Sequence, residues 1–264
     1  MCGRFVSATP PDQIAAYFGA DLAAEPLPEN YNVAPTNEIY AVVETPSGPQ
    51  LQVFHWGLVP HWAKERKIGQ KMINARAETV AEKPAFKSIL RKYRCIIPAD
   101  GFYEWQAAQT GMTVPVEAGE LALSAEPPKL TKSGRPAKQP MFIHRLDGEP
   151  LAFAGLWSVW TDRDAEANPK GLSLHSATII TTTANGTMAP VHDRMPVILP
   201  ASRWHEWLDP SNDDIESLTG LLVPAPDDLL TMHPVSTEVN NVRNKGAQLT
   251  DAIDPSTPDP GRLL

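Results

Sequence analysis

The sequence predicts a single α+β domain with a mostly antiparallel, barrel-like β-sheet core and short flanking helices. Many short segments rich in β-branched and aromatic residues are separated by turns that contain proline or glycine, whereas few segments have helical periodicity. The length of 264 residues permits one large domain or two small ones. No internal repeat of about 20–50 residues, the period of solenoids and propellers, is visible. We expect one domain over residues 1–250.

The expected helices are short. Pro10 and Pro11 follow a cap-like Thr9 and suit the first turn of a helix, which we expect to continue to about Phe18 and to end at Gly19. Further helices are expected at residues 84–90, 201–208 and 213–222.

The first strands follow a loop. Residues 31–36 are expected to be extended, because a residue that precedes a proline is disfavoured in a helix. Residues 39–43 and 51–56 predict a β-hairpin around the turn at 45–49. Other strands are expected at residues 93–98, 177–182 and 196–199.

Asp147-Gly148 is the strongest hairpin signal in the chain, since this dipeptide favours the turn that joins paired antiparallel strands. It predicts that residues 141–146 and 151–156 form a second hairpin. Cys95, between apolar neighbours in its strand, is expected to be a small core residue.

Two stretches differ from the rest of the chain. Residues 106–139 are rich in Ala, Gly, Pro and Lys without a clear period, and predict an irregular insertion. Residues 251–264 are acidic and rich in proline, and predict a disordered tail.

The charge is distributed unevenly. The net charge of −8 argues against a general affinity for nucleic acid. Residues 64–94, however, hold ten basic and three acidic residues, and residues 205–264 hold three basic and eleven acidic ones. This asymmetry is compatible with a basic groove on an acidic body. A solvated helix face and an acidic tail would explain it equally well.

Several classes of protein are disfavoured. The longest apolar runs are far shorter than the roughly 20 residues of a membrane helix, and the N-terminus lacks the pattern of a secretory signal. Two cysteines do not make a disulfide framework, which favours the reducing cytoplasm. The seven histidines show no metal-ligand spacing, and no phosphate loop, nucleophile elbow or zinc motif occurs. We expect neither a metal nor a cofactor.

Cys2 carries the first chemical signal. If Met1 is removed, Cys2 presents an α-amine and a thiol on adjacent carbons. Both groups are partly available as nucleophiles near neutral pH. Such a 1,2-aminothiol can attack a carbonyl twice, so that an imine forms first and the sulfur then closes a thiazolidine ring. A cysteine in a frayed terminus is the alternative.

Three further segments, residues 74–79, 101–105 and 191–196, bring together groups that support this chemistry. Glu104, between two aromatic residues, is a candidate proton shuttle, and His192 can give or take a proton. Asn74 can hold an oxygen without titrating. Arginines able to bind a phosphate in a bidentate manner are Arg4, Arg76 and Arg194. Taken singly, each residue could equally serve in an ion pair, a cap or a salt bridge.

An ordered set of motifs resembles the SOS response-associated peptidase (SRAP) family of abasic-site-processing proteins. These motifs extend over nearly the whole chain up to about residue 245. They are Met-Cys-Gly-Arg-Phe at 1–5, Tyr-Asn-Val-Ala-Pro-Thr at 31–36, Trp-Gly-Leu-Val-Pro at 56–60, Asn-Ala-Arg-Ala-Glu-Thr at 74–79, Arg-Cys-Ile-Ile-Pro at 94–98, Gly-Phe-Tyr-Glu-Trp at 101–105, Ala-Gly-Leu-Trp at 154–157 and His-Asp-Arg-Met-Pro at 192–196.

The resemblance implies that Cys2 becomes the first residue and forms a thiazolidine with the ring-opened aldehyde of an abasic site in single-stranded DNA. Glu104 would manage protons, His192 would assist opening of the sugar ring, and Asn74 would orient Cys2. The family's peptidase label implies removal of the residue before Cys2, with self-cleavage as one route. The positions that match DNA-contacting residues of the family are Arg4, Asn32, Pro35, Trp62, Arg76, Trp105, Thr181 and Arg194.

The expected partner is single-stranded DNA with abasic sites, bound by a monomer in the cytoplasm at the nucleoid, without a membrane. Two other functions stay open. An N-terminal-nucleophile cysteine hydrolase of peptides or amides would need no set of arginines. A non-catalytic single-strand binding module would not need Cys2 and would release DNA fully at high salt.

Overall fold

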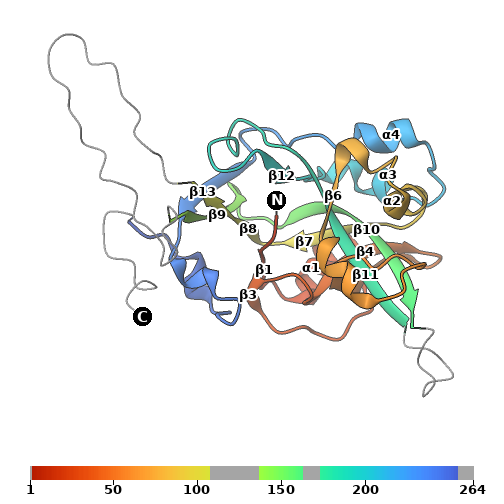
Figure 1. Ribbon diagram of the computed structural model, residues 1–264, viewed down its shortest axis with the longest axis horizontal. Coiled ribbons are helices and arrows are strands. Elements are labelled where there is room, and N and C mark those ends of the chain that lie inside the picture. Colours follow the sequence, from red (N-terminus) through yellow and green to blue (C-terminus); the bar gives the residue numbers. More distant parts are fainter. Residues whose placement is uncertain (1, 108–136, 163–172, 255–264) are drawn as a thin grey trace, which may run out of the picture.

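The computed structural model describes residues 2–107, 137–162 and 173–254. Within these ranges, short helices surround two β-sheets that are mainly antiparallel, which confirms the predicted fold class (Figure 1). Most of the predicted insertion and of the predicted tail lies outside the described residues.

The larger sheet closes into a barrel. Four of the five pairings between its barrel strands are antiparallel, and the fifth, a parallel pairing of β11 with β5, closes the barrel. The barrel strands are β4 (Glu38–Thr45), β5 (Gly48–Trp56), β7 (Arg94–Ala99), β10 (Leu151–Thr161) and β11 (Ser173–Thr183). Three short strands extend it: β2 (Asp21–Leu22), β6 (Asn74–Arg76) and β12 (Arg194–Pro196).

The smaller sheet is antiparallel throughout, in the order β13-β9-β8-β1-β3. Its strands are β1 (Phe5–Ser7), β3 (Asn30–Val33), β8 (Gly101–Gln106), β9 (Gln139–Arg145) and β13 (Leu230–Pro234). β8 follows β7 after a single residue and pairs with β1. The two sheets are therefore joined next to the start of the chain.

Successive side chains of the barrel strands point to opposite faces and form two hydrophobic cores, as expected for strands buried on both faces. Along β4, Ile39, Ala41 and Val43 pack with Phe5 and Phe102 of the smaller sheet. Residues on the opposite faces of the same strands pack against the helices. The helices are α1 (Pro11–Phe18), α2 (Pro84–Lys87), α3 (Trp204–Leu208) and α4 (Ile215–Gly220). Figure 1 shows α2 and α4 at the end of the molecule opposite to β13.

The first helix agrees with its prediction, since α1 ends at Phe18 and Gly19 takes the left-handed conformation with φ 62°. Thr9, however, is not its cap. The hydroxyl of Thr9 donates to Asp100, whereas Pro10 occupies the N-cap position without a side-chain hydrogen bond.

The predicted hairpin around Asp147-Gly148 is wrong, although the hairpin of β4 and β5 is confirmed. A tight turn does form, with φ 77° at Gly148. The strands on either side do not pair, because β9 joins the smaller sheet and β10 joins the barrel. A turn motif fixes the direction of the chain over four residues, whereas the available sheet edges decide which strand each neighbour pairs with.

Residues 31–36 are partly strand rather than loop alone. β3 ends at Val33, and a turn follows in which Asn37 N–H donates to Ala34 O over 3.1 Å. Thr36 takes φ 75°, a left-handed conformation that is rare for a β-branched residue. The turn therefore holds local backbone strain directly after Pro35.

Candidate active site

Cys2 lies in the core at the junction of the two sheets. Its side chain is fully buried beside residues of both sheets. The Cys2 carbonyl oxygen accepts a hydrogen bond of 2.8 Å from Asn74 Nδ2, and the thiol lies 4.0 Å from Arg4 O. Burial raises the pKa of the Cys2 thiol, and the Glu104 carboxylate raises it further. The chain end is therefore anchored, and its thiol is held in the protonated form.

Glu104 is a buried acid whose charge acts on the Cys2 thiol, and the pairing of β8 with β1 places it there. Phe5 pairs with Phe102, and Tyr103 N–H donates to Arg4 O over 3.0 Å. The same register places Glu104 opposite Gly3. Only 4% of Glu104 is exposed, and this burial raises the pKa of its carboxyl group. The positive charges of the N-terminal ammonium and of His192 act in the opposite direction. A carboxyl group whose pKa is raised in this way can give a proton as well as take one.

Asn74 reaches Cys2 from the barrel. It begins β6, which pairs in parallel with β11, and Asn74 lies opposite Ile179. The backbone beside it is fixed by Trp56, whose Nε1–H donates to Ile73 O over 3.1 Å. While Nδ2 binds the Cys2 carbonyl, Oδ1 is buried and has no hydrogen-bond partner among the described residues. This acceptor is well suited to an amine or hydroxyl group that enters the site.

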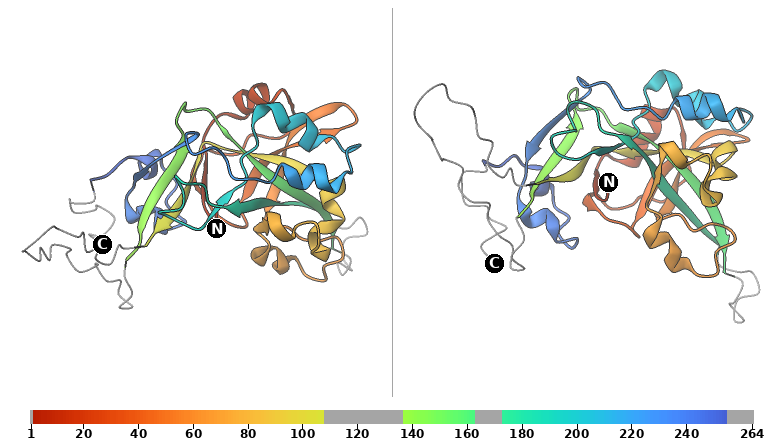
Figure 2. Two further views of the ribbon diagram at one scale, coloured as in Figure 1. Left: turned by 90° about the horizontal axis from the view of Figure 1, so that it is seen from above. Right: turned by 45° about the horizontal axis from the view of Figure 1, so that its top comes forward.

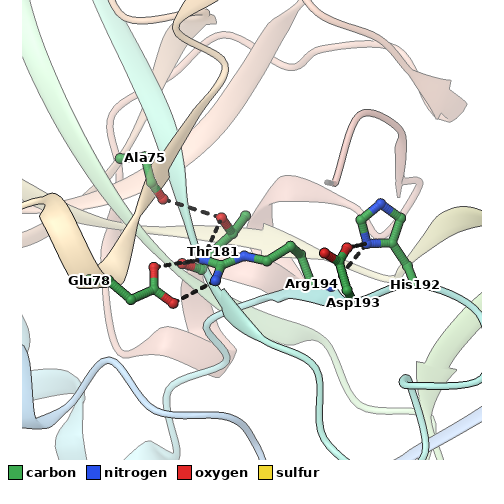
Figure 3. A network of polar contacts seen from close by, with 6 residues as sticks. All are labelled: Ala75, Glu78, Thr181, His192, Asp193 and Arg194. Atoms are coloured by element: carbon green, nitrogen blue, oxygen red, sulfur yellow. Dashed lines mark hydrogen bonds and ion pairs between the residues drawn. The ribbon is translucent and has the colours of Figure 1, made fainter.

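His192 is held by its Nδ1 atom. Arg194 N–H donates to Nδ1 over 2.9 Å, so the neutral ring has its lone pair on Nδ1 and its proton on Nε2. Asp193 Oδ1 lies 2.9 Å from the same nitrogen, and a protonated ring would donate its Nδ1 hydrogen there instead. Figure 3 shows that the ring turns its other nitrogen away from Asp193. Both protonation states of His192 therefore have a ready partner, as an acid–base group requires.

Arg194 is engaged within the protein. Its guanidinium group forms a two-pronged contact with the Glu78 carboxylate and donates to Thr181 O over 2.7 Å (Figure 3). Thr181 is fully buried and donates to Ala75 O over 3.4 Å. Arg76, which pairs with Thr181 across the strands, is exposed. A phosphate at Arg194 would have to take the place of the Glu78 carboxylate.

Arg4 and Asn32 form a second polar group in the smaller sheet. Arg4 donates to Asn32 Oδ1 and to Val239 O, each over 2.9 Å, and its guanidinium carbon lies 5.8 Å from the ring centroid of Trp105. Asn32 is fully buried, and its Nδ2 is 3.1 Å from each of three carbonyl oxygens between 239 and 244. Asn32 thus orients Arg4 and a neighbouring loop, while Trp105 Nε1 donates to Asn240 Oδ1.

Trp62 lies on a third segment, with 54% of its surface exposed. Its loop is fixed by a close backbone contact, since a Cβ atom at Gly57 would lie 2.6 Å from Gly69 O. Pro35 is half-buried at the turn after β3. Both views in Figure 2 show the gold segment, which carries the basic residues from 64 onward, at the opposite end from β9 in light green.

The structure therefore brings Cys2, Asn74, Glu104 and His192 together from four segments. It also contains contributors that sequence reasoning did not identify as functional: Glu78, Asp193 and the loop at residues 239–245. Glu78 and Asp193 lie within the predicted motifs. The contacts of Glu78 with Arg194 and of Asp193 with His192 form only in the folded protein. The loop at 239–245 has no local signal, because it acts mainly through backbone carbonyls.

The described residues lack two features. They contain no group of three or more His, Cys, Asp or Glu residues that could hold a metal ion. No helix among them is long and apolar enough to cross a membrane.

Comparisons with known proteins give consistent results. Residues 1–242 match the sequence profile of a family described as SOS response associated peptidase (SRAP). The chain is 39% identical over 254 residues to the abasic site processing protein YoaM of Bacillus subtilis, covering 96% of this chain and 98% of the relative. It is 30% identical to the abasic site processing protein YedK of Escherichia coli, covering 96% and 100%. A crystal structure of a protein from Bacteroides thetaiotaomicron shares the fold with a TM-score of 0.76 at 24% identity, covering 96% of this chain and 100% of the other.

Proposed function

Because the chain belongs to the SRAP family, we propose that it processes abasic sites by joining Cys2 covalently to single-stranded DNA. One observation carries the proposal. Cys2 is not frayed but buried, with its carbonyl held by Asn74 and its thiol beside a buried carboxyl group. A structural cysteine needs neither of these partners, whereas a reacting aminothiol needs both.

The proposed reaction starts once Met1 has been removed. The Cys2 amine adds to the C1′ aldehyde of the opened sugar, and the resulting carbinolamine loses water to give an imine. The sulfur then adds to the imine carbon, and the thiol proton passes to the nitrogen. One C–N and one C–S bond form, the aldehyde oxygen leaves as water, and no oxidant or reductant is needed.

The surrounding residues supply the proton transfers. Glu104 protonates the departing hydroxyl group of the carbinolamine and takes the proton of the thiol, which burial keeps neutral until then. When the C1′–O4′ bond of the sugar breaks, the C1′ hydroxyl group loses its proton and His192 transfers a proton to O4′. Asn74 fixes the Cys2 backbone, and its Oδ1, which has no partner among the described residues, accepts a hydrogen bond from the hydroxyl group of the carbinolamine when that forms. All four side chains come from one chain, so a monomer is sufficient.

The DNA strand is proposed to lie over the arginines and aromatic residues around this site. Arg76 is exposed and ready for a phosphate, whereas Arg194 exchanges Glu78 for one. Trp62 and Pro35 offer surfaces for stacking or wedging of bases.

A crosslinking assay tests the proposal. A single-stranded oligonucleotide with one uracil is treated with uracil glycosylase, incubated with the protein, and analysed by denaturing gel and intact mass. We expect an adduct that survives SDS and heat, with the mass of both partners less one water. Cys2→Ala keeps the amine, so it should yield only an imine that borohydride traps. Cys95→Ala, which removes the other buried cysteine, is the matched control. Absence of an adduct from wild-type protein that has lost Met1 would refute the proposal.

We also propose that the protein removes Met1 itself, in keeping with the family's description as a peptidase. Insertion of a leucine between Met1 and Cys2 tests this, because aminopeptidases that remove methionine do not act before a large residue. With the leucine inserted, intact mass should show that the otherwise wild-type protein loses both Met1 and the leucine. The same protein with Glu104→Gln should retain both residues. Retention of the extension in both proteins would assign the removal to a separate peptidase.

A further inference from the structure

A cavity of about 480 Å³ lies at the end of β5 and the start of β11, and no residue of the candidate active site lines it. Its volume falls within the range of about 300–1,000 Å³ that is usual for ligand pockets. The side chains that matter to its chemistry come from the turn after β3, the starts of β4 and β11, the end of β5 and the basic segment. They are Thr36, Glu38, Phe54, His55, Arg66 and His175.

The lining combines one cation, one anion and flat rings. Arg66 is exposed, and its guanidinium Nη2 lies 3.3 Å from His55 Nδ1. His175 is exposed and its ring centroid lies 5.8 Å from that of the buried Phe54. Glu38 pairs with His55 across the strands. Burial and the charge of Arg66 lower the pKa of His55, and the charge of Glu38 opposes them only in part. A simple anion would be repelled by Glu38, whereas a nucleotide offers a phosphate to Arg66, a base to the rings and a base amine to Glu38.

Strand β11 links the cavity to the active site, because it lines the cavity and pairs with β6, which carries Asn74. His175 and Ile179 lie on the same face of β11, and Ile179 is opposite Asn74. Four residues of strand span about 13 Å at about 3.3 Å each. This is the length of about four nucleotides of a stacked single strand at about 3.4 Å each, and of fewer in an extended one. A strand with its abasic site at Cys2 can thus reach the cavity within a few nucleotides.

A strained turn forms the rim on the same side. Thr36 lines the cavity in a left-handed conformation, and its N–H donates to Trp56 O over 2.8 Å. Strain of this kind is concentrated at ligand-binding segments, where it fixes a side chain that an unstrained turn would direct elsewhere. The preceding residue, Pro35, belongs to the proposed DNA groove, so groove and cavity are continuous along the chain.

We propose that this cavity binds a nucleotide of the single strand that flanks the abasic site, with its phosphate on Arg66 and its base against His175. The proposal rests on the function proposed above. It adds a second anchoring point that holds the strand on one side of the lesion while Cys2 reacts.

The test measures binding without crosslinking. Oligonucleotides carry a tetrahydrofuran analogue of the abasic site, which has no aldehyde. One flank is kept at a single nucleotide while the other is extended from one to six, first on the 5′ side and then on the 3′ side. Affinity for the full-length protein is measured by fluorescence anisotropy at one fixed salt concentration, because phosphate contacts depend on salt.

For wild type we expect a step of at least about fivefold in affinity within four nucleotides on one flank only, as stacking on one ring provides. Arg66→Ala and His175→Ala should each remove the step. Lys67→Ala is the matched control. It removes the same charge as Arg66→Ala does, but the side chain of Lys67 does not line the cavity and pairs with Glu65. The step should persist in Lys67→Ala.

Any of three results would overturn the subsite. Affinity could rise smoothly on both flanks, or the step could survive in both cavity variants. Binding of free dAMP to the cavity without any step would assign it to a mononucleotide instead. Crosslinking of wild type to a true abasic site, measured in parallel on the shortest strand, separates these outcomes from failure of the proposed function.

Discussion

Replacement of Asn74 by alanine should separate stability from reactivity. The change leaves the Cys2 carbonyl oxygen without its 2.8 Å hydrogen bond from Nδ2, which costs about 1–3 kcal/mol. It also removes Oδ1, a buried acceptor without a partner among the described residues, whose burial costs about 1–3 kcal/mol. The two terms oppose each other, so the free energy of unfolding should change by less than about 1 kcal/mol.

The rate should change far more. Without Asn74 the Cys2 backbone is no longer fixed against the barrel, and a small misplacement of a reacting group costs up to about 100-fold. We expect adduct formation to slow by about 10- to 100-fold, equivalent to about 1.4–2.7 kcal/mol in the activation barrier. Denaturant unfolding gives the stability, a quenched gel time course gives the rate, and intact mass confirms that Met1 has been removed.

Asn185 provides the matched control. It is a buried asparagine whose amide is fully engaged: Nδ2 donates to Ala225 O and Pro226 O, and Oδ1 accepts from Met188 N–H. Asn185→Ala should therefore cost about 2–4 kcal/mol in stability and leave the rate per folded molecule unchanged. A wild-type rate in Asn74→Ala, or a loss of stability equal to that of Asn185→Ala, would refute the reasoning.

Three further predictions follow from the charges and the backbone. Glu104→Gln should slow adduct formation by about 100- to 10,000-fold. Because burial raises the pKa of Glu104, the folded state binds the carboxyl proton more tightly than the unfolded state does. Wild type should therefore lose stability as the pH rises from the ordinary carboxyl pKa through the raised one. Urea unfolding of Glu104→Gln should not show this loss, and the same pH profile in both proteins would contradict the prediction. Glu78→Gln should bind single-stranded DNA up to about fivefold more tightly at low salt, since Arg194 no longer has a competing carboxylate; weaker binding would show instead that the pair only supports the site. Thr36→Gly should raise stability by about 0–1 kcal/mol, as relief of the left-handed strain exceeds the entropy cost of glycine; a loss of more than about 1 kcal/mol would contradict that balance.

Local sequence determined the parts of the fold that depend on neighbouring residues. The end of α1 at Gly19 and the hairpin of β4 and β5 formed where residue types predicted them, because backbone conformation is a short-range property. The pairing of strands was not local. Asp147-Gly148 made its turn, yet the chain passed from one sheet to the other, because partner strands from distant parts of the chain completed each sheet.

The same distinction applies to the site. Cys2, Asn74, Glu104 and His192 could be proposed from the sequence because each residue type has a chemistry of its own. Their relative positions could not, since they come from separate strands and loops that only the joined sheets bring together. Burial, which raises the pKa values of Cys2 and Glu104, is likewise a product of packing.

Only the tertiary structure decided which polar side chains are already engaged within the protein and which can contact DNA. From the sequence, Arg194 was a phosphate ligand and Asn32 a groove residue. In the folded protein Arg194 holds Glu78, and Asn32 is buried beneath the loop at 239–245, because each polar group that leaves water must find a partner within reach. The sequence by itself thus determined which reactive groups the protein has, and the fold determined which of them face each other.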